Sequence, residues 1–70
     1  MPASVAITVN GERRETTQGA TVADLLRDLN LPTGRVAVER NLEVLPRPQW
    51  LNTAIQPGDR YEIVHFVGGG

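Results

Sequence analysis

The residues with the clearest chemical potential are the three glycines that end the 70-residue chain, Gly68, Gly69 and Gly70. Glycine has no side chain to bury and loses the most backbone entropy on ordering, so the triplet adds nothing to a folded core. Three such residues form a thin arm, about 10 Å long when extended, that ends in a carboxylate. The pattern indicates either a reactive C-terminal arm or a frayed tail or cloning remnant.

Other reactive groups are scarce along the chain. It has no cysteine and a single histidine, His65, so no thiolate nucleophile, disulfide or cysteine–histidine metal site is expected. We interpret His65 as a partly exposed strand residue. The sequence therefore predicts no catalytic residue, no metal site and no bound cofactor.

Composition narrows the class of protein further. The length allows one small domain, and the formal net charge is −1, with seven basic and eight acidic residues interleaved. Interleaved charges argue against a nucleic-acid partner, which requires concentrated positive charge. No apolar run approaches the roughly 20 residues of a membrane span, and no secretory signal is apparent. We expect a cytoplasmic protein without a membrane partner.

Hydrophobic periodicity predicts how the chain begins. In residues 5–9 the large apolar residues Val5, Ile7 and Val9 alternate with the smaller Ala6 and Thr8, as in a half-buried strand. Asn10-Gly11 then favours a two-residue hairpin turn, because both positions must accept positive φ. Residues 12–17 form the expected returning strand, whose polar character suits a sheet edge.

A helix is predicted to begin after Thr21 as N-cap, with Asp24 in the position of a capping-box acid. Asn30 is the expected C-cap, and Pro32 prevents much continuation. An apolar stripe at positions i, i+3, i+4 and i+7 should cover a sheet. The stripe consists of Val22, Leu25, Leu26 and Leu29.

The second half of the chain predicts three more strands. Residues 35–40 form one, residues 43–45 a short partner beyond a turn at 41–42, and residues 61–67 the last. Pro57-Gly58-Asp59 marks a tight turn before the last strand. Side chains expected to cover the open side of the core are Trp50, Leu51 and Ile55, and Tyr61 is expected in or beside the core.

This element order predicts an α+β fold in which a mixed sheet packs on one helix. Residues 1–67 would form the single domain and residues 68–70 its arm. The last strand is expected to be central because both of its faces are apolar, unless another protein covers one of them. Val64 and Phe66 share a face beside the arm, so they are either core residues or an exposed docking patch. Two further surface residues, Arg47 and Arg60, are interpreted as solvated charges or as contacts to acidic partner residues.

Several segments together resemble a known family. They are Val9-Asn10-Gly11-Glu12, Thr21-Val22-Ala23-Asp24-Leu25-Leu26, Arg35-Val36-Ala37-Val38-Glu39, the stretch 41–47 with Trp50, Pro57-Gly58-Asp59-Arg60, and Ile63-Val64-His65-Phe66-Val67 before the glycines. In this order they resemble the ThiS family, sulfur carriers of thiamin biosynthesis with the ubiquitin-like β-grasp fold. The resemblance covers essentially the whole chain.

Two positions depart from related patterns. Leu42 stands where a glycine would ease the turn at 41–42, so the geometry of that hairpin is open. Phe66-Val67 replaces the proline-containing approach to the glycines that is common in MoaD, the related carriers of molybdopterin synthesis. The second departure favours the ThiS side of the family.

The resemblance implies a chemical role for the arm. An E1-like enzyme, ThiF, would use ATP and Mg²⁺ to adenylate the carboxylate of Gly70. Sulfur from a cysteine desulfurase or another donor would displace AMP, leaving a C-terminal thiocarboxylate that the thiazole synthase ThiG consumes. Gly68 and Gly69 would let the arm enter both active sites. The chain would be a protein cosubstrate and not an enzyme.

Other functions remain open at this point. The same thiocarboxylate could serve molybdopterin synthesis, and the same activated glycine could attach a ubiquitin-like modifier to lysines. A plain interaction module would tolerate deletion of Gly69 and Gly70.

Overall fold

A β-hairpin begins the fold, as the alternating residues predict. In the computed structural model, which describes residues 3–31 and 35–66, β1 (Ser4–Val9) pairs antiparallel with β2 (Glu12–Thr17). Asn10 and Gly11 have φ angles of 50° and 82°, the positive values that a type I′ turn requires. The polar β2 lies at a sheet edge, as expected.

The helix α1 (Val22–Asp28) begins with the predicted capping box. The Thr21 hydroxyl accepts a hydrogen bond from the Asp24 N–H at 3.2 Å, and an Asp24 carboxylate oxygen accepts one from the Thr21 N–H at 2.9 Å. These bonds satisfy two backbone donors that a helix N-terminus otherwise leaves free. The backbone hydrogen bond from Thr21 is the main reason that the pKa of Asp24 lies below its ordinary value.

The C-terminal end of α1 corrects one prediction. Leu29 is the C-cap, and Asn30 follows it with a left-handed φ of 61°. The N–H groups of Asn30 and Leu31 donate to the carbonyls of Arg27 and Leu26 at 3.0 and 3.3 Å. This pair of bonds is a Schellman motif, in which the left-handed residue lies one position beyond the cap. Pro32 lies outside the described residues.

The remaining elements follow in the predicted order with shifted ends. β3 (Val36–Arg40) pairs antiparallel with β4 (Glu43–Val44), which is shorter than expected. An unpredicted 3₁₀ helix, η2 (Arg47–Asn52), follows Pro46. β5 (Arg60–His65) begins one residue before the predicted start, and Val67, its predicted end, lies outside the described residues.

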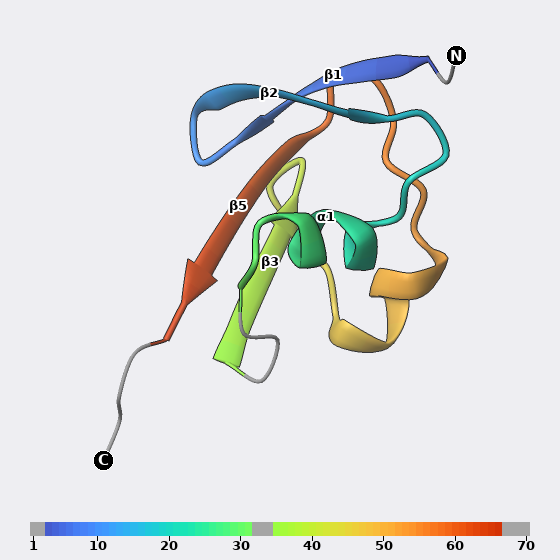
Figure 1. Cartoon of the computed structure of the whole chain (residues 1–70). Coiled ribbons are helices and arrows are strands. Elements are labelled where there is room, and N and C mark those ends of the chain that lie inside the picture. The colour runs from blue at the N-terminus through green and yellow to red at the C-terminus, as the bar shows by residue number, and fades with distance from the viewer. Residues whose placement is uncertain (1–2, 32–34, 67–70) are drawn as a thin grey trace.

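The five strands form one mixed sheet in the order β2-β1-β5-β3-β4. β5 runs parallel to β1 and antiparallel to β3, and Figure 1 shows it crossing the molecule between them. The central position predicted for the last strand is therefore confirmed. The helix α1 packs on one face of this sheet, which confirms the α+β class.

The core lies between α1, η2 and the sheet. Trp50 and Ile55 are 5% and 3% exposed, and Tyr61 is fully buried, as predicted. The prediction for Leu51 is wrong, because its side chain is 74% exposed. In the tight 3₁₀ turn Trp50 points inward, and its indole N–H donates to the Leu45 carbonyl at 2.9 Å, so the next residue faces outward. The buried apolar residues are Val5, Ile7, Val22, Leu25, Leu26, Val36, Val38, Trp50, Ile55, Tyr61 and Ile63.

Candidate functional site: the end of the central strand

Gly70, the residue expected to react, lies outside the described residues, as do the arm residues Gly68 and Gly69. The structure instead describes β5, the strand that leads toward them, and the residue that follows it, Phe66. Because β5 is central, its backbone is held from both sides over much of its length. Three sets of contacts hold its beginning, its middle and its end.

The beginning of β5 is held by the buried carboxylate of Asp59, which is 5% exposed. One of its oxygens accepts hydrogen bonds from the Tyr61 hydroxyl at 2.8 Å, the Gln56 N–H at 2.9 Å and the Arg40 Nε at 3.0 Å. The other oxygen accepts from the Asn41 amide at 3.1 Å. A single side chain thus joins the turn before β5 to the hairpin of β3 and β4.

This network shifts the pKa values of Asp59 and Tyr61, and also that of Arg40. Burial alone would raise the pKa of Asp59, but the hydrogen bonds from Gln56, Asn41, Tyr61 and Arg40 outweigh burial and lower it below the ordinary value. Burial, together with the hydrogen bond to Asp59, raises the pKa of Tyr61 to about 12. Asp59 is therefore a carboxylate and Tyr61 a neutral phenol at neutral pH. The network has a structural role that the sequence reading did not identify.

The middle of β5 is held by the side chain of Asn10, beyond the end of β1. Its Oδ1 accepts a hydrogen bond from the Ile63 N–H at 2.7 Å, and its Nδ2 donates to the Ile63 carbonyl at 3.1 Å. The backbone N–H of Asn10 also donates to the Tyr61 carbonyl at 2.8 Å. The amide side chain thus replaces one residue of a neighbouring strand. The sequence reading assigned Asn10 only to the turn.

The last described part of β5 pairs only with β3. His65 lies opposite Val36, and the Phe66 N–H donates to the Arg35 carbonyl at 2.8 Å. Val64 and Phe66 are 53% and 54% exposed, so they are not core residues. The sequence left two interpretations open, core residues or an exposed docking patch. The exposure of both side chains agrees with the second. Docking of a partner there stays a prediction.

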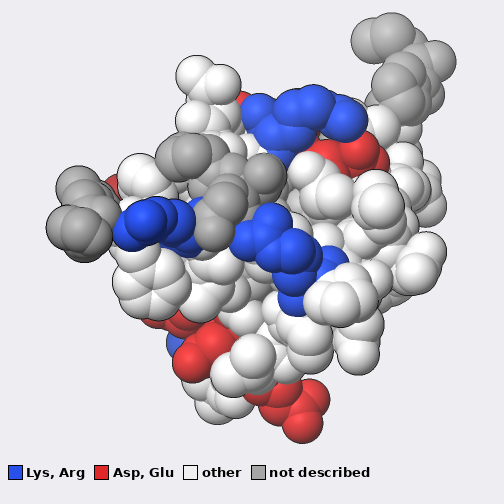
Figure 2. All heavy atoms as spheres, turned by 90° about the horizontal axis from the view of Figure 1, so that it is seen from below, with Lys and Arg blue, Asp and Glu red and all other residues white. Residues whose placement is uncertain are grey.

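The other residues singled out in the sequence lie on the surface. His65 and Arg60 are exposed, and the Arg47 guanidinium lies 4.8 Å from the centre of the Trp50 ring, a cation–π contact. Within the described residues there is no group of three or more metal-ligating side chains and no helix long and apolar enough to cross a membrane. On the face seen in Figure 2, arginine side chains lie in separate groups rather than one patch.

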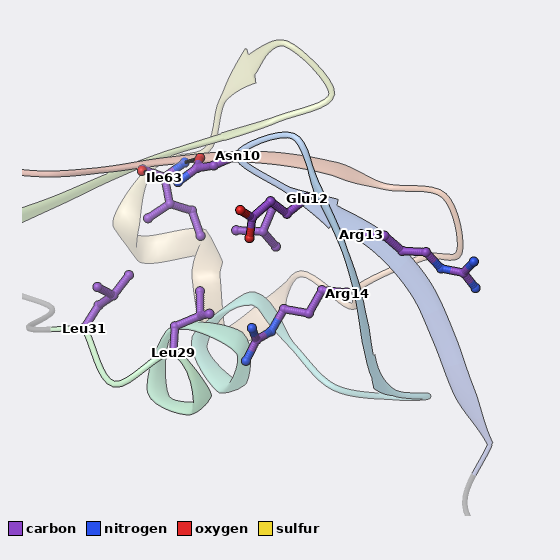
Figure 3. Close-up of a pocket in the computed structure, with 8 residues that line it drawn as sticks. Asn10, Glu12, Arg13, Arg14, Leu29, Leu31 and Ile63 are labelled. Carbon is purple, nitrogen blue, oxygen red and sulfur yellow. Dashed lines mark hydrogen bonds between the residues drawn. The ribbon is translucent and has the colours of Figure 1, made fainter.

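The structure also contains an open cleft of about 350 Å³ between the β1–β2 hairpin and the end of α1. Figure 3 shows Leu29, Leu31 and Ile63 around it, whereas Arg13 points away. Its walls combine these apolar side chains with Glu12 and Arg14. The apolar walls adjoin the core, and the polar groups of the cleft do not form an acid–base or nucleophile arrangement.

Comparison with known proteins connects this fold to one family. The family model described as the ThiS family matches residues 7–70. The sulfur carrier protein ThiS of Bacillus subtilis is 42% identical over 50 residues, covering 71% of this chain and 76% of that protein. A thiazole synthase of Paramagnetospirillum magneticum is 44% identical over 64 residues, or 91% of this chain. The chain spans only 20% of the length of that synthase.

Solved structures agree with the sequence relatives. The crystal structure of the thiamine biosynthesis protein ThiS from Geobacter metallireducens has a TM-score of 0.79 and 35% identity, covering 94% of this chain and 100% of that one. A designed protein based on a ubiquitin template has a TM-score of 0.53 at 20% identity, which shows a shared fold alone. The fold is the ubiquitin-like β-grasp.

Proposed function

The chain belongs to the ThiS family of sulfur carriers, and on that premise we propose that its C-terminal glycine, Gly70, carries the sulfur used to form the thiazole ring of thiamin. The observation that carries this proposal is the extent of the family match, which runs from residue 7 to the last glycine. Residues 68–70 would be the arm, and the rest of the chain would present it to enzymes.

The chemistry follows from the weakness of a carboxylate as an electrophile. In the proposed reaction the Gly70 carboxylate attacks the α-phosphorus of Mg²⁺-bound ATP in an E1-like enzyme, ThiF, and pyrophosphate leaves. Sulfur from a donor such as a cysteine desulfurase then attacks the acyl carbon, and AMP leaves. When the donor is a persulfide, a second thiol must cleave the resulting acyl disulfide to release the thiocarboxylate. In this proposal the chain itself is a cosubstrate that binds no cofactor.

The acceptor of the sulfur would be a thiazole synthase of the ThiG type. Support comes from the thiazole synthases of Paramagnetospirillum magneticum and Magnetococcus marinus, in which a region similar to this chain makes up 20% of the protein. A carrier-like region within the synthase itself is consistent with close association of the two. ATP-dependent activation of this kind also agrees with a cytoplasmic location.

The docking surface in this proposal is the exposed pair Val64 and Phe66. Both side chains lie on the helix-free side of β5, immediately before the arm. Their position would let a partner bind the strand and receive the glycines in its active site in one step. Contiguous exposed apolar patches mark sites at which proteins bind partners.

The proposal is tested by intact-mass measurement. The protein is incubated with the E1-like enzyme, Mg-ATP and a sulfide source, and we expect the mass gain of one oxygen-to-sulfur exchange. A chain lacking Gly70 is the control and should gain nothing. An unchanged mass of the full-length chain, with an enzyme active on its own carrier, would overturn the proposal.

Mass alone does not identify the pathway. The thiocarboxylate form is therefore offered separately to a thiazole synthase and to the large subunit of molybdopterin synthase. We expect sulfur transfer to the thiazole synthase, whereas transfer to the other acceptor would assign the chain to molybdopterin synthesis. Lysine-linked conjugates that resist reductant would instead indicate a protein modifier.

A further inference from the structure

The face of the sheet opposite α1 carries a second feature beside the exposed apolar pair. Strand register places Ala37 opposite Val64 and Val44 opposite Glu39 on this face. Val44 is 73% exposed, Val64 is 53% exposed, and Ala37 is exposed as well. We call the set Ala37, Glu39, Val44, Glu62, Val64 and Phe66 the helix-free patch.

Two carboxylates lie directly opposite each other inside the helix-free patch. Glu39 of β3 is the register partner of Glu62 of β5, and both side chains are exposed. Like charges directly opposite each other on neighbouring strands destabilise a sheet. Among residues 3–31 and 35–66 neither carboxylate has an ion-pair or hydrogen-bonding partner.

No ion pair within residues 3–31 and 35–66 includes Glu39 or Glu62. Along the same face, Glu62 is flanked by Arg60 and Val64, but the ion pairs of the described chain do not include Arg60. Across the strands, the neighbour of Glu39 on the far side is the apolar Val44. An apolar protein surface that covered this patch would remove water from two facing negative charges. Such burial is unfavourable unless the surface supplies an opposite charge.

We propose that the partner covering the helix-free patch is an apolar protein surface with an arginine or lysine that enters between Glu39 and Glu62. This inference rests on the proposed function, because it describes the chemistry of the enzyme surface that receives the carrier. An arginine suits the site best, because its planar fork can bond two carboxylates at once. In the free carrier the repulsion between Glu39 and Glu62 would cost stability. In the complex the same two charges would be complementary to the cation of the partner.

The test compares isosteric neutralisation on and off the patch. The double variant Glu39→Gln/Glu62→Gln keeps shape and removes both charges. Glu43→Gln is the matched control, because Glu43 is exposed, lies opposite Arg40 and faces the other side of β4. Binding to purified E1-like enzyme and to purified thiazole synthase is measured at low and at moderate salt.

Opposite effects on stability and binding are expected from the double variant. Its unfolding midpoint should rise, because the repulsion is gone. Its affinity for at least one enzyme should fall roughly tenfold or more, and the salt dependence of its association rate should flatten. The control should bind like the wild type. Unchanged affinity and salt dependence of the double variant for both enzymes would overturn the inference.

A charge reversal makes the distinction sharper. Glu39→Lys would form an ion pair with Glu62 across the strands, so this variant should fold at least as stably as the wild type. The new cation should repel the one on the partner, so binding should be weaker than in the double glutamine variant. A variant that folds well and binds the partner as tightly as wild type would contradict the inference. Failure of the proposed function is recognised separately, as a wild-type chain that never gains sulfur.

Discussion

Leu42 is the residue whose backbone conformation fits its type least well. It follows Asn41 in the turn between β3 and β4. The φ angle of Leu42 is 73°, and that of Asn41 is 52°. Asparagine tolerates this left-handed region, but a leucine there costs about 1–2 kcal/mol. The side chain is 77% exposed, so burial does not offset the strain. The hairpin forms all the same, which answers the question that the sequence left open at this turn.

Replacing Leu42 by glycine should therefore stabilise the domain. We expect Leu42→Gly to raise the free energy of unfolding by about 1 kcal/mol, because glycine adopts positive φ without steric cost. Chemical denaturation followed by the fluorescence of the single tryptophan measures the change. Leu42→Ala is the control: it removes the exposed side chain but keeps the strain, so a gain equal to that of glycine would contradict the explanation.

The burial of the Tyr61 phenol, together with its hydrogen bond to Asp59, determines how stability depends on alkaline pH. The pKa of Tyr61 is raised from 10.0 to about 12, mainly by burial. The folded state therefore holds the phenol proton more tightly than the unfolded state does. Its contribution to stability is complete below pH 10 and is lost as pH rises toward 12.

We expect the free energy of unfolding of the wild type to fall between pH 10 and 12 and that of Tyr61→Phe to fall less. Near neutral pH the variant should be less stable by about 1 kcal/mol, because the buried hydrogen bond is lost. Tyr61 is the only tyrosine, so phenolate absorbance reports its titration directly. A midpoint near 10 in the folded protein would show that burial does not shift this group.

Among the elements, β5 is the one on which the site depends, and side chains as well as strands hold it. β1 ends at Val9, and the Asn10 amide continues the pairing to Ile63. Asn10 thus has two roles, one in the turn and one in the side-chain hydrogen bonds to Ile63. A glycine at that position would keep the turn and lose these hydrogen bonds. On the side of β1, β5 is thus hydrogen-bonded as far as Ile63, although β1 itself ends at Val9.

Asn10→Gly should destabilise the domain by about 1–2 kcal/mol, through the loss of two hydrogen bonds to backbone groups. The Ile63 amide should also exchange with solvent faster, as measured by NMR. Asn10→Asp keeps the acceptor for the Ile63 N–H but lacks the donor, so its loss should be intermediate. Equal stability of Asn10→Gly and wild type would assign the residue to the turn alone.

At the scale of the whole molecule, folding and the proposed chemistry use different parts of the chain. The buried apolar residues all lie between Val5 and Ile63. The proposed reactive residues follow this interval and should contribute little to stability. Substitutions in the two parts should therefore have separable effects.

Gly69→Ala should lower the rate of adenylation while leaving the unfolding midpoint unchanged, because a methyl group obstructs a narrow channel without touching the core. ATP–pyrophosphate exchange with the E1-like enzyme measures the rate. Gly58→Ala supplies the reverse pattern, since Gly58 has a φ of 83° in the turn before β5. That variant should lose stability and keep the exchange rate; a normal rate for Gly69→Ala would count against the narrow channel.

Local patterns predicted the elements well where their causes are local. The capping box at Thr21 and the turn at Asn10-Gly11 depend on neighbouring residues only, and both are observed. The errors lie where a local pattern permits two outcomes. Asn30 is left-handed as expected for a helix end but lies one position beyond the cap, and Leu51 is apolar yet faces solvent because η2 turns Trp50 inward.

The sequence by itself determined the family and the order of the strands and the α-helix, and it predicts Gly70 as the reacting residue, because these depend on residue types and their spacing. Only the tertiary structure decided which face of β5 is open, since both faces are apolar and burial depends on where α1 packs. It also brought together residues far apart in the chain: Asp59 with Arg40, Asn10 with Ile63, and Glu39 with Glu62. Such pairings follow from strand register, which is a property of the assembled sheet.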